Sequence, residues 1–197
     1  CWAGSRLIVH EDVAEELVEK IKAEVGKWQI GAGLSEGVRI GSMVSKSHRQ
    51  SVIDLLEQGL AQGGELVLGG GCPDGDLADG AFMEPTIVTG VDPSDPIAQN
   101  EVFGPVVAVI PFDSEGEAVR IANGTDYGLA AAVWTRDLSR AHRMIRAIRA
   151  GVVHVNTYGG PDVTVPIGGV KQSGNGHDKS LHAFDKYLDL KTAWIKL

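Results

Sequence analysis

The sequence predicts an α/β fold in which a mostly parallel, open sheet carries helices on both faces. Short β-rich runs alternate with longer segments of helical periodicity along the 197 residues, and this alternation is typical of β–α–β crossovers. Some of the short runs are apolar throughout, as in residues 106–110 (VVAVI), which favours strands covered on both faces. A chain of this length can bury a core without disulfides or metals.

The first part of the chain predicts a strand over residues 6–10 (RLIVH) and then an amphipathic helix. The apolar residues of this helix recur at every fourth position, at Val13, Leu17, Ile21 and Val25. Residues 29–45 are rich in glycine and serine, which indicates a connection. A second helix ends near Gly63 and Gly64. Its apolar face consists of Ile53, Leu56 and Leu60.

Further elements follow in alternation. Strands are expected over residues 65–68, 86–91, 106–110, 130–135 and 152–156, and a helix over residues 115–122. Asp137 can cap a last long helix that ends by Gly151. The residues of this helix that we expect to face inward are Leu138, Ala141, Ile145 and Ile148.

The final part predicts a long loop over residues 157–177, and loops of that length inside compact domains are usually functional. A short helix (180–187) and a last strand (188–195) close the chain. This strand alternates apolar and polar residues, so we expect an edge strand that can pair with another subunit.

Composition excludes several classes of function. A net charge of −8 argues against a nucleic-acid binder, and an arginine stripe over 136–149 is typical of a solvated helix face. We expect no membrane association, since there is no long apolar run or signal peptide. Two cysteines, one of them Cys72 in a turn-rich segment, make no disulfide framework and favour the cytoplasm. The histidines lack metal-ligand spacing, so no metal site is expected.

Four motifs, in order along the chain, resemble those of the NAD(P)-dependent aldehyde dehydrogenases. Residues 1–6 (CWAGSR) look like the segment of the family's nucleophile, and residues 101–106 (EVFGPV) resemble its Glu-Ile-Phe-Gly-Pro-Val. Residues 123–129 (NGTDYGL) and 166–174 (PIGGVKQSG) match Asn-x-Thr-x-Tyr-Gly-Leu and Pro-Phe-Gly-Gly-x-Lys-x-Ser-Gly. The chain thus resembles the carboxyl-terminal catalytic portion of the family. The resemblance implies a catalytic domain over 1–186 and the strand of an oligomerisation element over 187–197.

Within the family, residues 131–144 and 171–183 are most similar to the γ-glutamyl-γ-aminobutyraldehyde dehydrogenases of putrescine breakdown. Three positions depart from the pattern: Ile167 replaces a phenylalanine, Val170 an aromatic residue and His177 an arginine. The resemblance therefore implies a small aldehyde as substrate, with an amino- or γ-glutamylamino-aldehyde expected and the fine preference open.

The resemblance also implies roles for individual residues. Cys1 would be the nucleophile, which suits a thiolate and its labile acyl intermediate. Glu101 would accept hydrogen bonds from the hydroxyls of the nicotinamide ribose, and Phe103 would pack beside that ribose. The small wall of Gly160, Pro161 and Asp162 would line the aldehyde entrance. Asn156 and Lys171 are expected to fix this loop rather than to touch substrate.

The resemblance implies NAD or NADP as the cofactor. The choice between the two stays open, because the residue that reads the ribose 2′ position would precede Cys1. The family's glycine-rich phosphate segment, general-base glutamate and oxyanion asparagine would also lie upstream, so residues 1–197 alone are expected to be almost inactive. By resemblance the whole enzyme would be a homo-oligomer. Two alternatives stay open: a non-catalytic module that associates through its sheet edge, and a hydrolase or esterase that uses Cys1 without nicotinamide.

Overall fold

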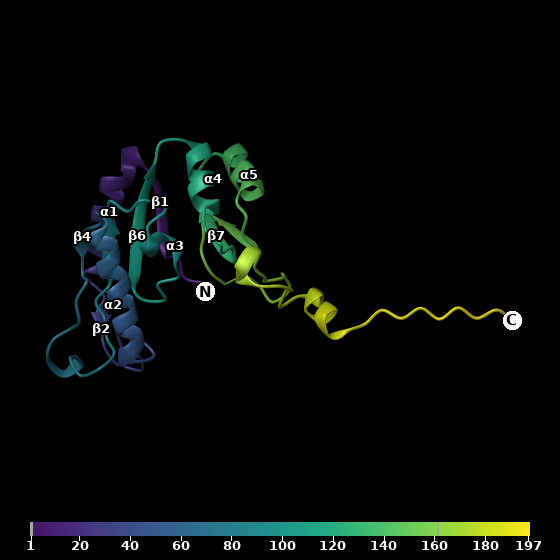
Figure 1. The fold of residues 1–197 in the computed structure, drawn as a ribbon, viewed down its shortest axis with the longest axis horizontal. Coiled ribbons are helices and arrows are strands. Elements are labelled where there is room, and N and C mark those ends of the chain that lie inside the picture. Colours follow the sequence, from purple (N-terminus) through teal and green to yellow (C-terminus); the bar gives the residue numbers. More distant parts are fainter. Residues whose placement is uncertain (1, 161) are drawn as a thin grey trace. The chain divides into compact units, whose positions relative to one another are not determined.

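A computed structural model describes residues 2–160 and 162–197 of the chain. The contacts divide these residues into two compact units, each described by itself below (Figure 1). The first unit comprises residues 3–124, and the second comprises Trp2 together with residues 125–197. The cysteine predicted as nucleophile, Cys1, and the predicted pocket residue Pro161 lie outside the described residues.

The first unit is built on a four-stranded sheet with the order β1-β6-β5-β4. The strands are β1 (Arg6–His10), β4 (Glu65–Leu68), β5 (Thr86–Thr89) and β6 (Val106–Phe112). The β1–β6 and β6–β5 pairs are parallel, and β4 pairs antiparallel to β5. The remaining elements of the unit are α1 (Glu11–Val25), β2 (Gln29–Ile30), β3 (Val38–Ile40), α2 (Lys46–Ala61), the 3₁₀ turn η1 (Gly75–Leu77), α3 (Pro96–Gln99) and α4 (Glu115–Asn123).

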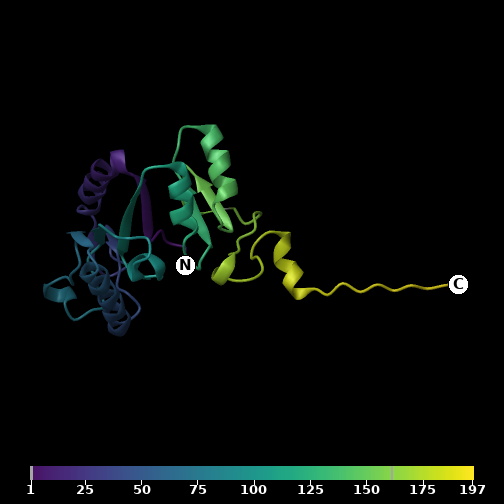
Figure 2. The same cartoon turned by 45° about the horizontal axis from the view of Figure 1, so that its top comes forward.

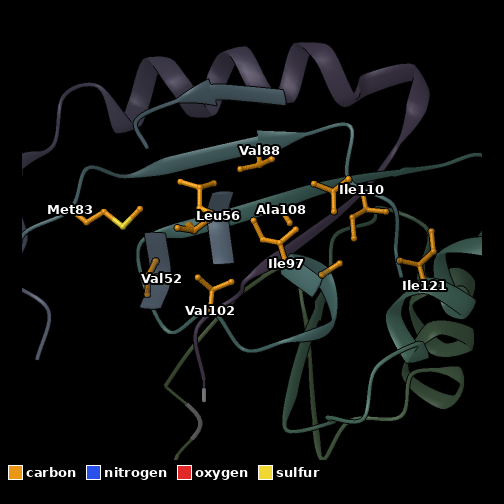
Figure 3. Packing of buried hydrophobic residues seen from close by; sticks show 12 residues of the cluster. Val52, Leu56, Met83, Val88, Ile97, Val102, Ala108, Ile110 and Ile121 are labelled. Atoms are coloured by element: carbon orange, nitrogen blue, oxygen red, sulfur yellow. The ribbon is translucent and has the colours of Figure 1, made fainter. Parts of the chain in front are cut away.

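Helices cover both faces of this sheet, as the sequence predicts. Alternate residues of β6 point to opposite sides: Val109 packs in a cluster with Val18 of α1, whereas Ala108 and Ile110 pack with residues of α2, α3 and α4. Figure 3 shows the second of these clusters, with α1 (purple) on the other side of the strands. The apolar run of β6 is therefore explained by burial on both faces.

The helices begin and end where local signals place them. The Ser45 hydroxyl accepts a hydrogen bond from the backbone N–H of His48 and caps α2, while Ser114 caps α4 in the same way through Glu117. In α1 the buried face includes Val18, and Val13 is 48% exposed, so the predicted apolar face is displaced toward Ala14 and Val18. Residues 29–45, predicted as a connection, contain β2 and β3, which are too short to give a periodic pattern.

The second unit contains the parallel pair β7 (Ala130–Val133) and β8 (Val152–Val155), joined through α5 (Leu138–Ala147). Two 3₁₀ segments follow, η2 (Lys171–Ser173) and η3 (Leu181–Tyr187). Asp137 caps α5, as predicted, by accepting from the N–H of Arg140. The prediction of its inward face is partly wrong: Leu138 and Ile145 are exposed, and the buried positions are Ala141, Met144 and Ile148.

The predicted last strand, residues 188–195, is not formed. Figures 1 and 2 show it as an extended trace beyond η3, and no strand is present there. Its apolar side chains lie open to solvent: Leu190 is 104% exposed and Trp194 92%. A strand exists only through hydrogen bonds to a neighbour, and within the described chain this segment has none. The predicted division into 1–186 and 187–197 stays a prediction.

Candidate functional site

Two of the predicted site residues, Glu101 and Phe103, lie on the loop that connects α3 to β6. Between them Val102 is buried at 5% exposure and packs in the core cluster of the first unit. Glu101 is exposed, and Phe103 is 63% exposed although it is a large apolar side chain. The buried valine thus fixes the loop to the core and turns its two neighbours outward.

The backbone of Phe103 adopts a left-handed conformation, with φ of 55°. Few residues with a bulky side chain do so, because Cβ approaches the following carbonyl. The imidazole Nε2 of His48 is hydrogen-bonded to the carbonyl oxygen of Phe103 at 2.9 Å, and the two rings meet edge to face at 6.0 Å. Such strain persists where surrounding contacts impose it, and it concentrates at functional sites.

The residues on either side of Phe103 leave the loop little freedom. A Cβ on Gly104 would come within 2.8 Å of the Val52 side chain, so only glycine fits at this approach. The carbonyl of Pro105 accepts from the N–H of Thr86 at 2.7 Å and joins the loop to β5.

The segment before β1 reaches the sheet at the same end as this loop, where the strands β1 and β6 begin. Strands β1 and β6 are parallel, so their amino ends lie side by side, and the N–H of Ala108 donates to the carbonyl of Ser5 at 3.0 Å. Residues 3–5 and the loop that carries Glu101 and Phe103 therefore lie at the same end of the sheet in the first unit (Figure 1). Cys1 itself belongs to the undescribed positions.

In the second unit, two of the predicted pocket residues follow β8. Gly160 has φ of 56° and its neighbour Gly159 of 93°, conformations that glycine adopts without strain. The Asp162 carboxylate is exposed, and its Oδ1 accepts from the N–H of Thr164 at 2.8 Å. Hydrogen bonds from the backbone and side chain of Thr164, with a smaller effect of the Lys179 charge, lower the pKa of Asp162. The carboxylate is therefore held in its ionised form and oriented by its own turn.

The side chains of Asn156 and Lys171 bind main-chain groups, and that they fix the loop rather than touch substrate stays a prediction. The Asn156 side chain accepts from the N–H of Thr135 at 2.9 Å and donates to its carbonyl at 2.8 Å, while its own backbone has φ of 54°. The Lys171 ammonium donates to the carbonyl of Thr125 at 2.8 Å. Both side chains thus bind backbone of the second unit.

Three functional candidates escaped the sequence reasoning. His48 supports Phe103 from 55 positions away, and no local pattern announces such a contact. His154 and Tyr158 pack against each other, and the Tyr158 hydroxyl donates to the carbonyl of Trp2. The one available signal was the position of Trp2, next to the predicted nucleophile.

Neither a group of metal ligands nor a membrane-spanning helix is found among the described residues. Within 2–160 and 162–197, no three histidine, cysteine or acidic side chains are grouped so that they could hold a metal ion. In the same part of the chain, no helix combines the length and apolar character needed to cross a bilayer.

Comparison with known proteins identifies the family. The profile of the aldehyde dehydrogenase family matches residues 1–193. The chain is 47% identical over 197 residues to the NADP/NAD-dependent aldehyde dehydrogenase PuuC of Escherichia coli (strain K12), covering all of this chain and 39% of that protein. It is 43% identical over 196 residues to the aminoacetaldehyde dehydrogenase of Pseudomonas aeruginosa, covering 99% and 38%.

Solved structures give the same result. The crystal structure of an indole-3-acetaldehyde dehydrogenase with NAD+ matches with a TM-score of 0.95 and 47% identity, over all of this chain and 40% of that one. Betaine aldehyde dehydrogenase from Staphylococcus aureus with NAD+ matches with a TM-score of 0.92 and 36% identity, over 95% and 37%. The predicted α/β fold class is thereby confirmed. The chain spans about two fifths of the length of the relatives it matches, and over that span it belongs to the aldehyde dehydrogenase family.

Proposed function

We propose that the protein oxidises a small aldehyde to its carboxylic acid with NAD or NADP, and that residues 1–197 supply the nucleophile and part of the cofactor site. The observation that carries the proposal is the family match, which begins at the CWAGSR segment and runs to residue 193. The names of the relatives support the reaction and the cofactor, since they are NAD- or NADP-dependent dehydrogenases or were solved with NAD+.

In this proposal the thiolate of Cys1 attacks the aldehyde carbon and forms a thiohemiacetal, whose oxygen carries the charge that develops. The bound nicotinamide supplies the acceptor for the hydride that leaves this carbon. The carbon is then a thioester of Cys1, and water releases it as the carboxylic acid. Cysteine suits both steps, because its thiolate is strongly nucleophilic and its acyl derivative is readily hydrolysed.

The loop before β6 would hold the nicotinamide end of the cofactor. Glu101 presents an exposed carboxylate, which only accepts hydrogen bonds and so fits a ribose diol. Phe103 presents an exposed ring, fixed in a strained backbone conformation, at the sheet edge that residues 3–5 also reach. An exposed aromatic residue that the fold constrains in this way is better explained by a ligand than by packing, since it buries little apolar surface.

For the substrate we propose an amino- or γ-glutamylamino-aldehyde that enters past Gly160, Pro161 and Asp162. Gly160 and its neighbour Gly159 keep this wall small, and Asp162 offers an ionised carboxylate to a substrate ammonium. The relatives named PuuC and aminoacetaldehyde dehydrogenase are consistent with this class. Assembly through residues 187–197 is proposed on the exposed apolar side chains of that segment. The cytoplasmic location stays a prediction.

The test replaces the aligned segment of the E. coli PuuC protein with residues 1–197 and measures NADH and NADPH formation by absorbance. We expect turnover of γ-glutamyl-γ-aminobutyraldehyde, and a loss of at least about a thousandfold on Cys1→Ala. Cys72→Ala, which removes the exposed cysteine of a surface loop, is the matched control and should keep full activity. A folded chimera that makes no reduced cofactor, or whose Cys1→Ala variant stays active, contradicts the proposal.

Residues 1–197 alone should produce almost no NADH, because the general base and the oxyanion asparagine implied by the resemblance lie outside this span. Each of these groups is worth about a hundredfold or more in rate in such reactions. Ester hydrolysis by the chain without cofactor, abolished by Cys1→Ser, would favour the hydrolase alternative instead.

A further inference from the structure

The chain contains two Asn-Gly dipeptides, Asn123-Gly124 in the first unit and Asn175-Gly176 in the second. In such a pair the side-chain amide of the asparagine lies next to a backbone nitrogen that no neighbouring Cβ shields, because the second residue is glycine. Attack of that nitrogen on the side-chain carbonyl carbon is therefore least hindered at these two places. The structure holds the two dipeptides in very different ways.

The Asn175 dipeptide lies in a short loop between two fixed points of the second unit. Before the loop, the N–H of Gln172 in η2 donates to the carbonyl of Asp126 at 2.9 Å. After the loop, Ile167 and Asp178 exchange two backbone hydrogen bonds of 2.8 and 2.7 Å. The hydrogen bonds at both ends leave residues 174–177 as an open connection.

Within this loop both reacting groups of the dipeptide are accessible. Asn175 and Gly176 are exposed, and the flanking Gly174 and Gly176 have φ of 125° and 77°. Among the described residues, neither the Asn175 side chain nor the N–H of Gly176 has a hydrogen-bond partner. No interaction therefore has to break before the nitrogen of Gly176 can approach the side chain of Asn175.

The Asn123 dipeptide is bound into the end of a helix. Asn123 is the last residue of α4 and is half-buried. The N–H of Gly124 donates to the carbonyl of Ile121 at 3.1 Å, and the carbonyl of Gly124 accepts from Nε2 of Gln99 at 2.8 Å. A helical backbone keeps ψ near about −42°, and ring closure requires the following nitrogen to rotate toward the side chain. Both hydrogen bonds of Gly124 oppose that rotation.

We propose that Asn175 is a site of spontaneous deamidation and that the fold protects Asn123 from the same reaction. The backbone nitrogen of Gly176 loses its proton to hydroxide and attacks Cγ of Asn175. The new N–Cγ bond replaces the Cγ–Nδ2 bond, Nδ2 takes up a proton and leaves as ammonia, and a cyclic succinimide remains. Water then adds to one of the two ring carbonyls and opens the ring to aspartate or isoaspartate. Nothing is oxidised or reduced.

The modification would change both the charge and the length of the loop. Each product adds one negative charge three positions before Asp178, whose carboxylate binds the ammonium of Lys186. The isoaspartate form also inserts one carbon into the backbone between η2 and the hydrogen bonds of Asp178. This loop directly follows residues 166–174, which match a motif of the family. The inference does not depend on the proposed function, because the reaction needs neither aldehyde nor cofactor.

The experiment incubates the protein in mildly alkaline buffer, once without urea and once in urea above the unfolding transition. A urea titration first shows that the sample without urea lies on the folded baseline. Peptide mass spectrometry then follows the replacement of NH₂ by OH at Asn123 and Asn175 with time. The measured quantity is the ratio of the rate in urea to the native rate, taken separately at each asparagine, so that each site is its own reference.

At Asn175 we expect a native rate within about threefold of the rate in urea, because the loop restricts at most one staggered torsion. At Asn123 the native rate should be at least about tenfold lower than in urea, because two hydrogen bonds of Gly124 must break first. In the control Asn175→Gln the longer side chain would have to close a larger ring. It should form far less product at this position and leave the rate at Asn123 unchanged.

Two results would overturn the inference. Slowing of Asn175 in the native protein by as much as Asn123 would show that the loop holds the dipeptide in an unreactive form. Equal native and unfolded rates at Asn123 would show that the end of α4 gives no protection.

Discussion

The guanidinium of Arg6 caps the C-terminal end of helix α4, where its Nη1 donates to the carbonyl oxygen of Ile121 at 2.9 Å. Its Nη2 donates to the carbonyl of Ala122 at 3.1 Å. The last carbonyls of a helix lack partners within the helix, and a positive charge there also complements the helix dipole. Since Arg6 ends the CWAGSR segment, this cap ties the start of β1 to a helix more than a hundred positions later.

Arg6→Met should destabilise the protein by about 2–3 kcal/mol, because two partly buried carbonyls lose hydrogen bonds to a charged donor. Arg6→Lys should recover part of this, since an ammonium keeps the charge without the planar fork. Urea unfolding measures both. Lys20→Met, which removes an exposed ion pair with Glu16, is the control and should change stability by less than about 0.5 kcal/mol. Equal effects of Arg6→Met and Lys20→Met would refute the capping role.

Gly104→Ala should displace the loop that carries Glu101 and Phe103. The new Cβ would meet Val52 Cγ1 at 2.8 Å, and Val52 is 1% exposed in the core. Overpacking of this kind costs about 1–3 kcal/mol, so a lower unfolding midpoint and weaker NAD+ binding by the PuuC chimera are expected.

Two further variants isolate the steric cause. Adding Val52→Ala to Gly104→Ala should cost less than the sum of the single changes, because the clash is then relieved. Gly116→Ala, in the open at helix α4, should stabilise by about 0.5–1 kcal/mol. Strict additivity in the double variant would show that the Val52 contact is not the cause.

Local sequence signals were sufficient for several elements of both units. The apolar run of β6 and the side chain of Asp137 predict, respectively, a strand covered on both faces and a capped helix, and the structure has both. The final strand failed for a physical reason: its hydrogen bonds would have to come from a neighbour, which a single chain does not provide. The prediction of the inward face of α5 was partly wrong, because periodicity alone did not show that Met144 is buried and Ile145 exposed.

At the candidate site, the motif resemblance predicts which residues matter but not how they are held. The positive φ of Phe103 and the contact of its carbonyl with His48 arise from packing between distant segments. The aromatic arrangement of Trp2, His154 and Tyr158 likewise joins Trp2 to β8. Contacts between residues so far apart in the sequence produce no periodic pattern, so only a three-dimensional structure reveals them.

Replacing Phe103 separates backbone strain from ring contacts. Phe103→Gly and Phe103→Ala both remove the ring, but only glycine adopts φ of 55° freely. Phe103→Gly should therefore be more stable than Phe103→Ala by about 1 kcal/mol in urea unfolding. Both should weaken NAD+ binding by the chimera to a similar degree. If Phe103→Ala proves as stable as Phe103→Gly, the left-handed conformation carries no strain.

Asp162→Asn should affect only substrates that carry an ammonium group. The exposed carboxylate, whose pKa is lowered by hydrogen bonds from Thr164, would attract such a group weakly through solvent. We expect KM of the chimera for γ-glutamyl-γ-aminobutyraldehyde to rise about two- to fivefold. KM for indole-3-acetaldehyde, which has no ammonium, is the internal control. A parallel rise for both aldehydes would mean that the substitution disturbs the loop rather than a charge contact.

Titration of Tyr158 should make stability fall in alkaline solution. Burial raises the pKa of Tyr158 above its ordinary 10.0, so above that value the folded state holds the phenol proton more strongly than the unfolded chain. The contribution of Tyr158 is fully present below about pH 10 and is lost as pH rises through the raised pKa. In Tyr158→Phe this loss is absent. The free energy of unfolding, measured with urea from about pH 8 to 11, should therefore fall more steeply with pH in the wild type than in Tyr158→Phe. The difference in slope should be less than about 1.4 kcal/mol per pH unit, because solvent screens a side chain that is 41% exposed. Parallel pH profiles would show that burial does not raise the pKa of Tyr158 in the folded protein.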